Sequence, residues 1–168
     1  MRKQDYLLSL IQALDTNEKR YFKLQNKLQK GHKKYDVLFD ELSTLNTYDA
    51  KALAKKLKKT GTQLSSEKEY LEKILMRSLR NFHEGATKRI ELTNTITEVE
   101  ILYSKRQYAT CLQLCEKALK ATLENELFEF ALIFIRLHNH SYQHVKNNMF
   151  DLGKQQLEFD ILKKMENE

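Results

Sequence analysis

The chain of 168 residues contains no proline and only four glycines. At the usual frequency of about 5%, a protein of this length would carry roughly eight prolines. Proline interrupts helices, and proline and glycine together mark most tight turns and strand ends. Apolar and polar residues do not alternate over a stretch long enough to make a strand. The sequence therefore predicts an all-α fold, a series of amphipathic helices joined by short polar turns.

Composition favours one helical domain over residues 1–168. Apolar residues make up 41% and charged residues 31% of the chain, which allows a sizeable core under a heavily solvated surface. The longest apolar run, residues 130–135, is followed by Arg136, whereas a helix that crosses a bilayer needs about 18 apolar residues. The first residues begin an amphipathic helix and lack the apolar segment of a signal peptide. We therefore expect a cytoplasmic protein that does not bind membranes.

Apolar spacing predicts five helices in the first half of the chain, over residues 4–14, 16–30, 34–45, 48–59 and 66–82. Asp15 with Glu18 has the pattern of a capping box and predicts the start of the second helix. Ser66 with Glu69 has the same pattern and predicts the start of the fifth. Gly61 is expected to follow the end of the fourth helix, because glycine tolerates the left-handed backbone of a helix end.

The second helix has an apolar and a basic face. Tyr21, Leu24 and Leu28 share one face, which we expect to be buried. The opposite face continues into the third helix as a row of lysines, Lys19, Lys23, Lys27, Lys30 and Lys34. We favour a solvated helix face as the interpretation of this row, ahead of a surface for an acidic protein. Nucleic acid is the third interpretation, because specific phosphate and base contacts use arginine more than lysine.

Four helices are predicted in the second half, over residues 88–105, 107–123, 126–146 and 150–167. Their connections have two to four residues, so successive helices should pack as antiparallel neighbours. The loop-like stretch 83–87 coincides with a reversal of charge. Residues 1–90 carry 20 Lys and Arg against 11 Asp and Glu, and residues 91–168 carry 9 against 12. A subdivision into a basic region, 1–83, and a second region, 88–168, follows from this pattern.

A repeat-like pattern lies in the second half. Leu102 and Tyr103 are followed by Tyr108, Cys111, Cys115 and Ala118, with slim residues where two helices of a hairpin would touch. A fainter copy follows 42 residues later, at Phe150, Gly153 and Leu157. The block resembles the second half of a tetratricopeptide repeat, although Thr95, Glu98, Val99 and Arg106 depart from the family pattern. The resemblance implies an α–α superhelix, a right-handed stack of eight or nine helices in antiparallel hairpins, with a concave binding groove.

A second resemblance covers the first half. Three segments are similar to the N-terminal region of uncharacterised bacterial helical-repeat proteins: residues 18–22, residues 35–42 and residues 70–80. That family has no assigned activity and its members are generally longer. The resemblance implies that this chain is a capping region, and that further repeats or a partner would pack against its last helices.

The sharpest chemical hypothesis is a zinc site. Cys111 and Cys115 are four residues apart on one predicted helix, as are His140 and His144 on the next, and two cysteines with two histidines are a known zinc set. We favour buried structural thiols and surface histidines, because the cysteines occupy slim repeat positions. Catalysis by His138, His140 or His144 is not expected either, since no acidic residue lies within a turn of His140 to orient it. The sequence thus predicts no cofactor and no enzymatic activity.

The function predicted from the sequence is a non-enzymatic scaffold that binds a protein or peptide. Residues expected to reach the partner are Glu98, Arg136, Asn139 and Tyr142. The last helix is apolar over a wide face, which suggests a homo-oligomer through Leu152, Leu157, Phe159, Ile161 and Leu162. The alternative is a nucleic-acid-associated helical protein that uses the basic N-terminal half.

Overall fold

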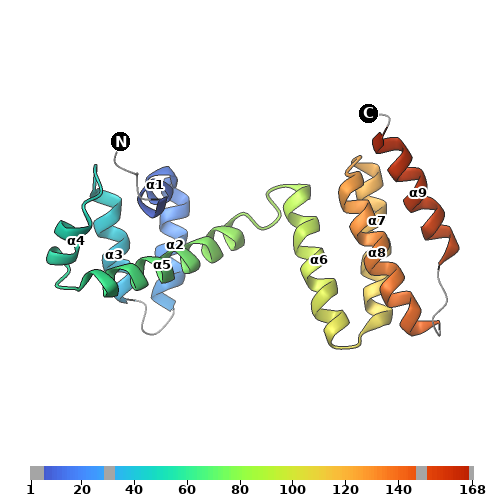
Figure 1. Cartoon of the computed structure of the whole chain (residues 1–168), viewed down its shortest axis with the longest axis horizontal. Helices are drawn as coiled ribbons and strands as arrows, with labels where there is room; N and C mark the ends of the chain where they lie inside the picture. Colours follow the sequence, from blue (N-terminus) through green and yellow to red (C-terminus); the bar gives the residue numbers. More distant parts are fainter. Residues whose placement is uncertain (1–5, 29–32, 147–150, 167–168) are drawn as a thin grey trace. The chain divides into compact units, whose positions relative to one another are not determined.

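The computed structural model describes residues 6–28, 33–146 and 151–166, without the side chains of residues 33, 34 and 166. Within these ranges the chain forms nine helices and no strand (Figure 1), which confirms the predicted all-α class and the stacking of helices. The helices are α1 (Tyr6–Ala13), α2 (Thr16–Leu28), α3 (Lys33–Thr44), α4 (Ala50–Lys56), α5 (Gly61–Phe82), α6 (Lys88–Ser104), α7 (Tyr108–Glu124), α8 (Phe128–Val145) and α9 (Leu152–Glu166). None of them is long and apolar enough to cross a membrane.

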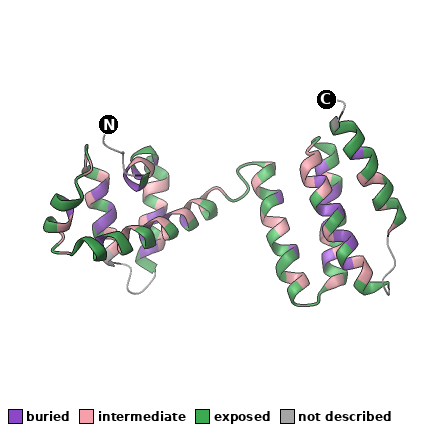
Figure 2. Cartoon of the chain, viewed as in Figure 1, coloured by how far each residue is buried: buried purple, intermediate pink, exposed green. Residues whose placement is uncertain are grey.

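The chain divides into two compact units, unit 1 from Met1 to Glu84 and unit 2 from Gly85 to Glu168. The division falls inside the loop-like stretch 83–87. Each unit has its own cluster of buried apolar residues (Figure 2). The two units are therefore described one at a time.

Unit 1 packs its helices around a pair of aromatic rings. Phe22 of α2 and Phe39 of α3 lie with ring centroids 4.7 Å apart and are almost fully buried. Around them α2 packs on α5, α1 on α3, and α4 on α5, so the main contacts are not all between consecutive helices. Leu71 and Leu75 bring the buried side of α5 into the same core. Helix α5 thus packs on α2, α3 and α4.

The ends of α4 and α5 differ from the prediction at Gly61. The left-handed conformation that closes α4 is adopted by Lys58, with φ 54°, and not by Gly61. Helix α5 already begins at Gly61, because Thr60 and Gln63 form the capping box that Ser66 and Glu69 were predicted to form. The extra turn brings Leu64 into the core.

The predicted capping box at the start of α2 is confirmed. The backbone N–H of Asp15 donates to a Glu18 carboxylate oxygen, and the backbone N–H of Glu18 donates to Asp15 Oδ1, each at 2.8 Å. The predicted buried face of α2 is wrong at Leu24, which is 59% exposed, and at Leu28, which is 81% exposed, whereas Tyr21 is half-buried against Phe82. Phe22 is buried in their place, because its ring fits against Phe39 while Leu24 lies on the other side of the helix.

In unit 2 each helix packs on the next one along the chain. Helix α7 packs on both α6 and α8, α8 packs on α9, and α6 also touches α8. Cys111, Ala118 and Ala131 are buried where the helices meet, and their small side chains let the backbones approach. Phe134 and Ile135 of α8 fill the centre of this core.

Candidate binding surfaces

Helices α6 and α8 lie side by side with a constant offset in sequence. At one end the Arg89 guanidinium forms an ion pair with Glu129 and lies 5.2 Å from the centre of the Phe130 ring. At the other end the Tyr103 hydroxyl is 2.8 Å from His144 Nε2. Residues in contact are therefore 40 or 41 positions apart at both ends, so the two helices run parallel as equivalent members of successive hairpins.

This alignment defines an exposed surface. Counting from Arg89 on α6 and from Glu129 on α8, steps of three and four residues trace two neighbouring stripes. The residues of these stripes are exposed, and they are called the α6–α8 face: Thr93, Thr97, Glu100, Ile133, Arg136 and His140. Ile133 is 38% exposed and supplies an apolar side chain between charged and polar ones.

Of the four residues predicted to reach a partner, Arg136 lies on the α6–α8 face, where its Nε donates to Glu158 of α9 at 3.1 Å. Glu98 lines a separate hollow of about 150 Å³ between α6 and α7. Asn139 is only 8% exposed, and Tyr142 is half-buried beside the His138 ring. Which residues of α8 are exposed depends on the rotation of the helix about its axis. The repeat pattern in the sequence did not reveal this rotation.

The structure does not bring the four candidate zinc ligands together. Cys111 and Cys115 are buried, and the Cys111 thiol lies 3.6 Å from the Val99 carbonyl oxygen. His140 is exposed, and His144 stacks on Tyr108 with ring centroids 4.3 Å apart. In the part of the chain that the structure describes, no three His, Cys, Asp or Glu residues converge as metal ligands would. Burial raises the pKa of the Cys115 thiol to about 12, so the thiol is neutral at physiological pH.

His138 has a carboxylate neighbour that the sequence did not indicate. It is 2% exposed, and its Nε2 lies 3.5 Å from a Glu116 carboxylate oxygen on α7. The two residues are far apart in sequence, and only the α7–α8 contact brings them together. Because the ring is enclosed by the core, a substrate has no access to it in this arrangement.

The predicted lysine row is partly neutralised. Lys23 forms an ion pair with Asp40 of α3, Lys19 is half-buried, and Lys27 is exposed. Lys30 and the side chain of Lys34 lie outside the described residues. A second group of lysines in the sequence consists of Lys51, Lys55, Lys56, Lys58 and Lys59. In this group Lys56 pairs with Glu41 and Lys59 pairs with Glu67.

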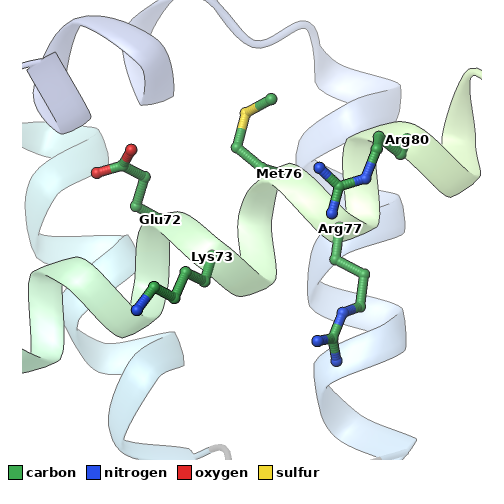
Figure 3. Close-up of a pocket in the computed structure, with 5 residues that line it drawn as sticks. All are labelled: Glu72, Lys73, Met76, Arg77 and Arg80. Carbon is green, nitrogen blue, oxygen red and sulfur yellow. The ribbon is translucent and has the colours of Figure 1, made fainter.

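Sequence reasoning missed a basic hollow on α5 (Figure 3). Its volume is about 300 Å³, and its lining residues all come from α5: Glu72, Lys73, Met76, Arg77 and Arg80. Lys73 is paired with Glu69 at 3.0 Å. Arg77 also borders a smaller hollow with Gln25 and Asn26 of α2. The spacing of Lys73, Arg77 and Arg80 on one helical stripe is the signal that could have revealed this surface.

The last helix divides its apolar residues between two sides. Ile161 is buried and Leu157 half-buried against the core of unit 2. Leu152, Phe159 and Leu162 are exposed, at 76%, 52% and 40%. The predicted apolar face of α9 is thus partly used within the unit.

No family model matches the chain, and neither a curated protein nor a solved structure shows significant similarity to it. The resemblances to tetratricopeptide repeats and to bacterial helical-repeat proteins therefore rest on the sequence motifs quoted above.

Proposed function

We propose that the protein is a non-enzymatic scaffold that binds a protein or peptide on the α6–α8 face. The observation that supports this most directly is the offset of 40 or 41 residues between α6 and α8. Successive hairpins with a constant offset place equivalent helices side by side, and repeat proteins use such a surface for recognition. Helix α7, whose sequence resembles part of a tetratricopeptide repeat, packs on both of these helices.

The chemistry of this face suits a peptide with mixed contacts. Ile133 offers an apolar contact at the centre of the face. His140 and the guanidinium nitrogens of Arg136 that do not donate to Glu158 can bind carboxylates or carbonyl oxygens. The Thr93 and Thr97 hydroxyls donate to backbone carbonyl oxygens of α6, and they can accept a hydrogen bond from a peptide N–H. An extended or helical segment with one apolar anchor and flanking polar groups would fit these side chains.

The nucleic-acid alternative has less support. Three of the lysines that could bind phosphates, Lys23, Lys56 and Lys59, are occupied by carboxylates. Affinity for nucleic acid depends on unneutralised cations, which release counterions from the phosphate backbone. Loss of oligonucleotide binding in a gel shift at physiological salt would agree with this ranking, whereas binding that persists there would reverse it.

Ile133 provides the test of the proposed function. A peptide-display library selected on the whole protein should yield sequences whose affinity falls at least about tenfold for the Ile133→Glu variant, because the central apolar contact is lost. Leu123→Glu is the matched control, since Leu123 of α7 is 36% exposed and lies outside the α6–α8 face. The proposal fails if selected peptides lose affinity equally for both variants, or if no sequence is enriched on a protein shown to be folded by circular dichroism.

A further inference from the structure

The acidic side chains of unit 1 are mostly engaged inside the unit. Of the ten that the structure describes there, eight cap a helix or pair with a neighbouring group: Asp15, Glu18, Asp36, Asp40, Glu41, Asp49, Glu67 and Glu69. Residues 1–84 contain 18 Lys and Arg against 11 Asp and Glu. Lys23, Lys56, Lys59 and Lys73 are among the basic side chains that pair with these carboxylates.

Helix α5 carries two arginines near its C-terminal end, Arg77 and Arg80. Both are exposed, and neither forms an ion pair with a described residue. They are three residues apart and both line the hollow of about 300 Å³. In Figure 3 the Arg77 side chain extends down from α5, and the Arg80 guanidinium lies nearer to Met76. A guanidinium can bind a carboxylate through two parallel hydrogen bonds, which makes this pair of residues suited to an acidic ligand.

Two exposed leucines lie on the adjoining helix. On α2, Tyr21 contacts Phe82 of α5, and Gln25 borders the same small hollow as Arg77. Tyr21 and Gln25 thus lie on the side of α2 that is next to α5. Leu28 follows Gln25 by three residues and Tyr21 by seven, so it lies on the same side of the helix. Leu24 is next to this stripe, one turn from Leu28. At 59% and 81% exposure, these two leucines present neighbouring apolar side chains to solvent.

We propose that Leu24, Leu28, Arg77 and Arg80, called the α2–α5 patch, dock an acidic amphipathic helix of a protein partner. The leucines would contact the apolar side of that helix, and the arginines would bind glutamates or aspartates beside it. Nucleic acid would satisfy the arginines but would leave the two leucines facing a charged backbone. The patch lies wholly in unit 1, so the inference does not depend on the α6–α8 face of unit 2.

The probe for this inference is a fluorescently labelled helical peptide of about 18 residues, or five turns. It carries leucines at every third or fourth position on one side and glutamates on both flanks. A second peptide has glutamine at each glutamate. Binding of both peptides to the whole protein is measured by fluorescence anisotropy at physiological salt. We expect the glutamate peptide to bind the protein, and to bind at least about tenfold more tightly than the glutamine peptide.

Variants locate the binding site. Arg77→Glu with Arg80→Glu should weaken the glutamate peptide at least about tenfold, and Leu28→Asn should weaken it as well. The matched control is Lys51→Glu with Lys55→Glu on α4, which changes the net charge of unit 1 by the same amount at two exposed positions. This control should change the affinity less than about twofold, because neither lysine belongs to the α2–α5 patch. Circular dichroism establishes that each variant keeps its helix content.

Three results would overturn the inference. The first is the absence of measurable binding of the glutamate peptide to the folded protein. The second is an equal loss of affinity in the α4 control, which would show diffuse attraction between opposite charges. The third is a single-stranded oligonucleotide that displaces the peptide, binds more tightly and depends on Arg77 and Arg80 but not on Leu28, which would make the patch a nucleic-acid surface.

Discussion

Burial controls the chemistry of the two thiols in unit 2. Cys111 and Cys115 are 0% and 1% exposed, and desolvation of the charged thiolate raises the pKa of both. A neutral, enclosed thiol is a poor nucleophile and a poor metal ligand. The cysteines therefore act as small apolar residues that let α7 approach its neighbours.

The raised pKa of Cys115 predicts a pH dependence of stability. The thiol titrates near 9.0 in the unfolded chain and near 12 in the folded one. Its contribution is complete below pH 9 and is lost as the pH rises towards 12, because only the unfolded chain releases the proton in this window. We expect the free energy of unfolding of the natural chain to fall more steeply between pH 9 and 12 than that of Cys115→Ala, measured by urea denaturation. Parallel pH profiles would contradict this.

At the scale of the element, α9 is attached to α8 on one side and leaves large apolar side chains exposed. Helix α8 holds it through Arg136 and Glu158 at 3.1 Å and through Lys164 above the Phe128 ring at 4.4 Å. These contacts leave Leu152, Phe159 and Leu162 exposed on the other side. Self-association of two copies through this stripe remains our proposal for the oligomeric state.

Phe159 provides a test of that proposal. If two copies pair through α9, Phe159→Glu should lower the average mass measured by light scattering at high protein concentration, because two buried carboxylates would face each other across the contact. The control is Leu123→Glu on α7, which adds the same charge at another partly exposed apolar position. A natural chain that stays monomeric at every concentration would rule out the pairing.

At the scale of the molecule, the separate cores of the two units have consequences for stability. The buried apolar residues fall into one cluster from α1 to α5 and another from α6 to α9. Loss of packing in one cluster removes contacts only from the helices that share it. Local stability should therefore differ between the units when one core is altered.

Leu75→Ala tests this separation. Leu75 is fully buried in unit 1, and truncating a buried leucine to alanine costs about 2–5 kcal/mol. We expect faster amide hydrogen exchange in α2, α3 and α5, and exchange in α7 and α8 unchanged, measured by mass spectrometry after proteolysis. Faster exchange across both units would show instead that they unfold as one.

Local patterns in the sequence were sufficient for most of the helices. Helical periodicity and the lack of proline act over a few residues, and the Asp15–Glu18 capping box satisfies backbone groups within one turn. The same reasoning failed at the start of α5, where two Ser or Thr positions compete for the same role. The capping box forms at Thr60 and Gln63 in the folded chain, and the turn added there buries Leu64.

The candidate surfaces were less accessible to sequence reasoning. Arg136 was predicted to reach a partner and is exposed, but Asn139 was not recognised as buried, and the sequence analysis did not name the arginines of α5. The lysine rows are evident in the sequence because their residues recur every three or four positions. Whether a lysine is free depends on carboxylates such as Asp40 that another helix brings to it.

The sequence by itself determined that this protein is helical and where most helices begin and end, because propensity, periodicity and capping are local interactions. Only the tertiary structure decided which side of α2 is buried and which charges remain unpaired. It alone showed that α6 and α8 align with an offset of 40 or 41 residues. These features depend on contacts between residues far apart in the chain, whose pairing no local pattern specifies.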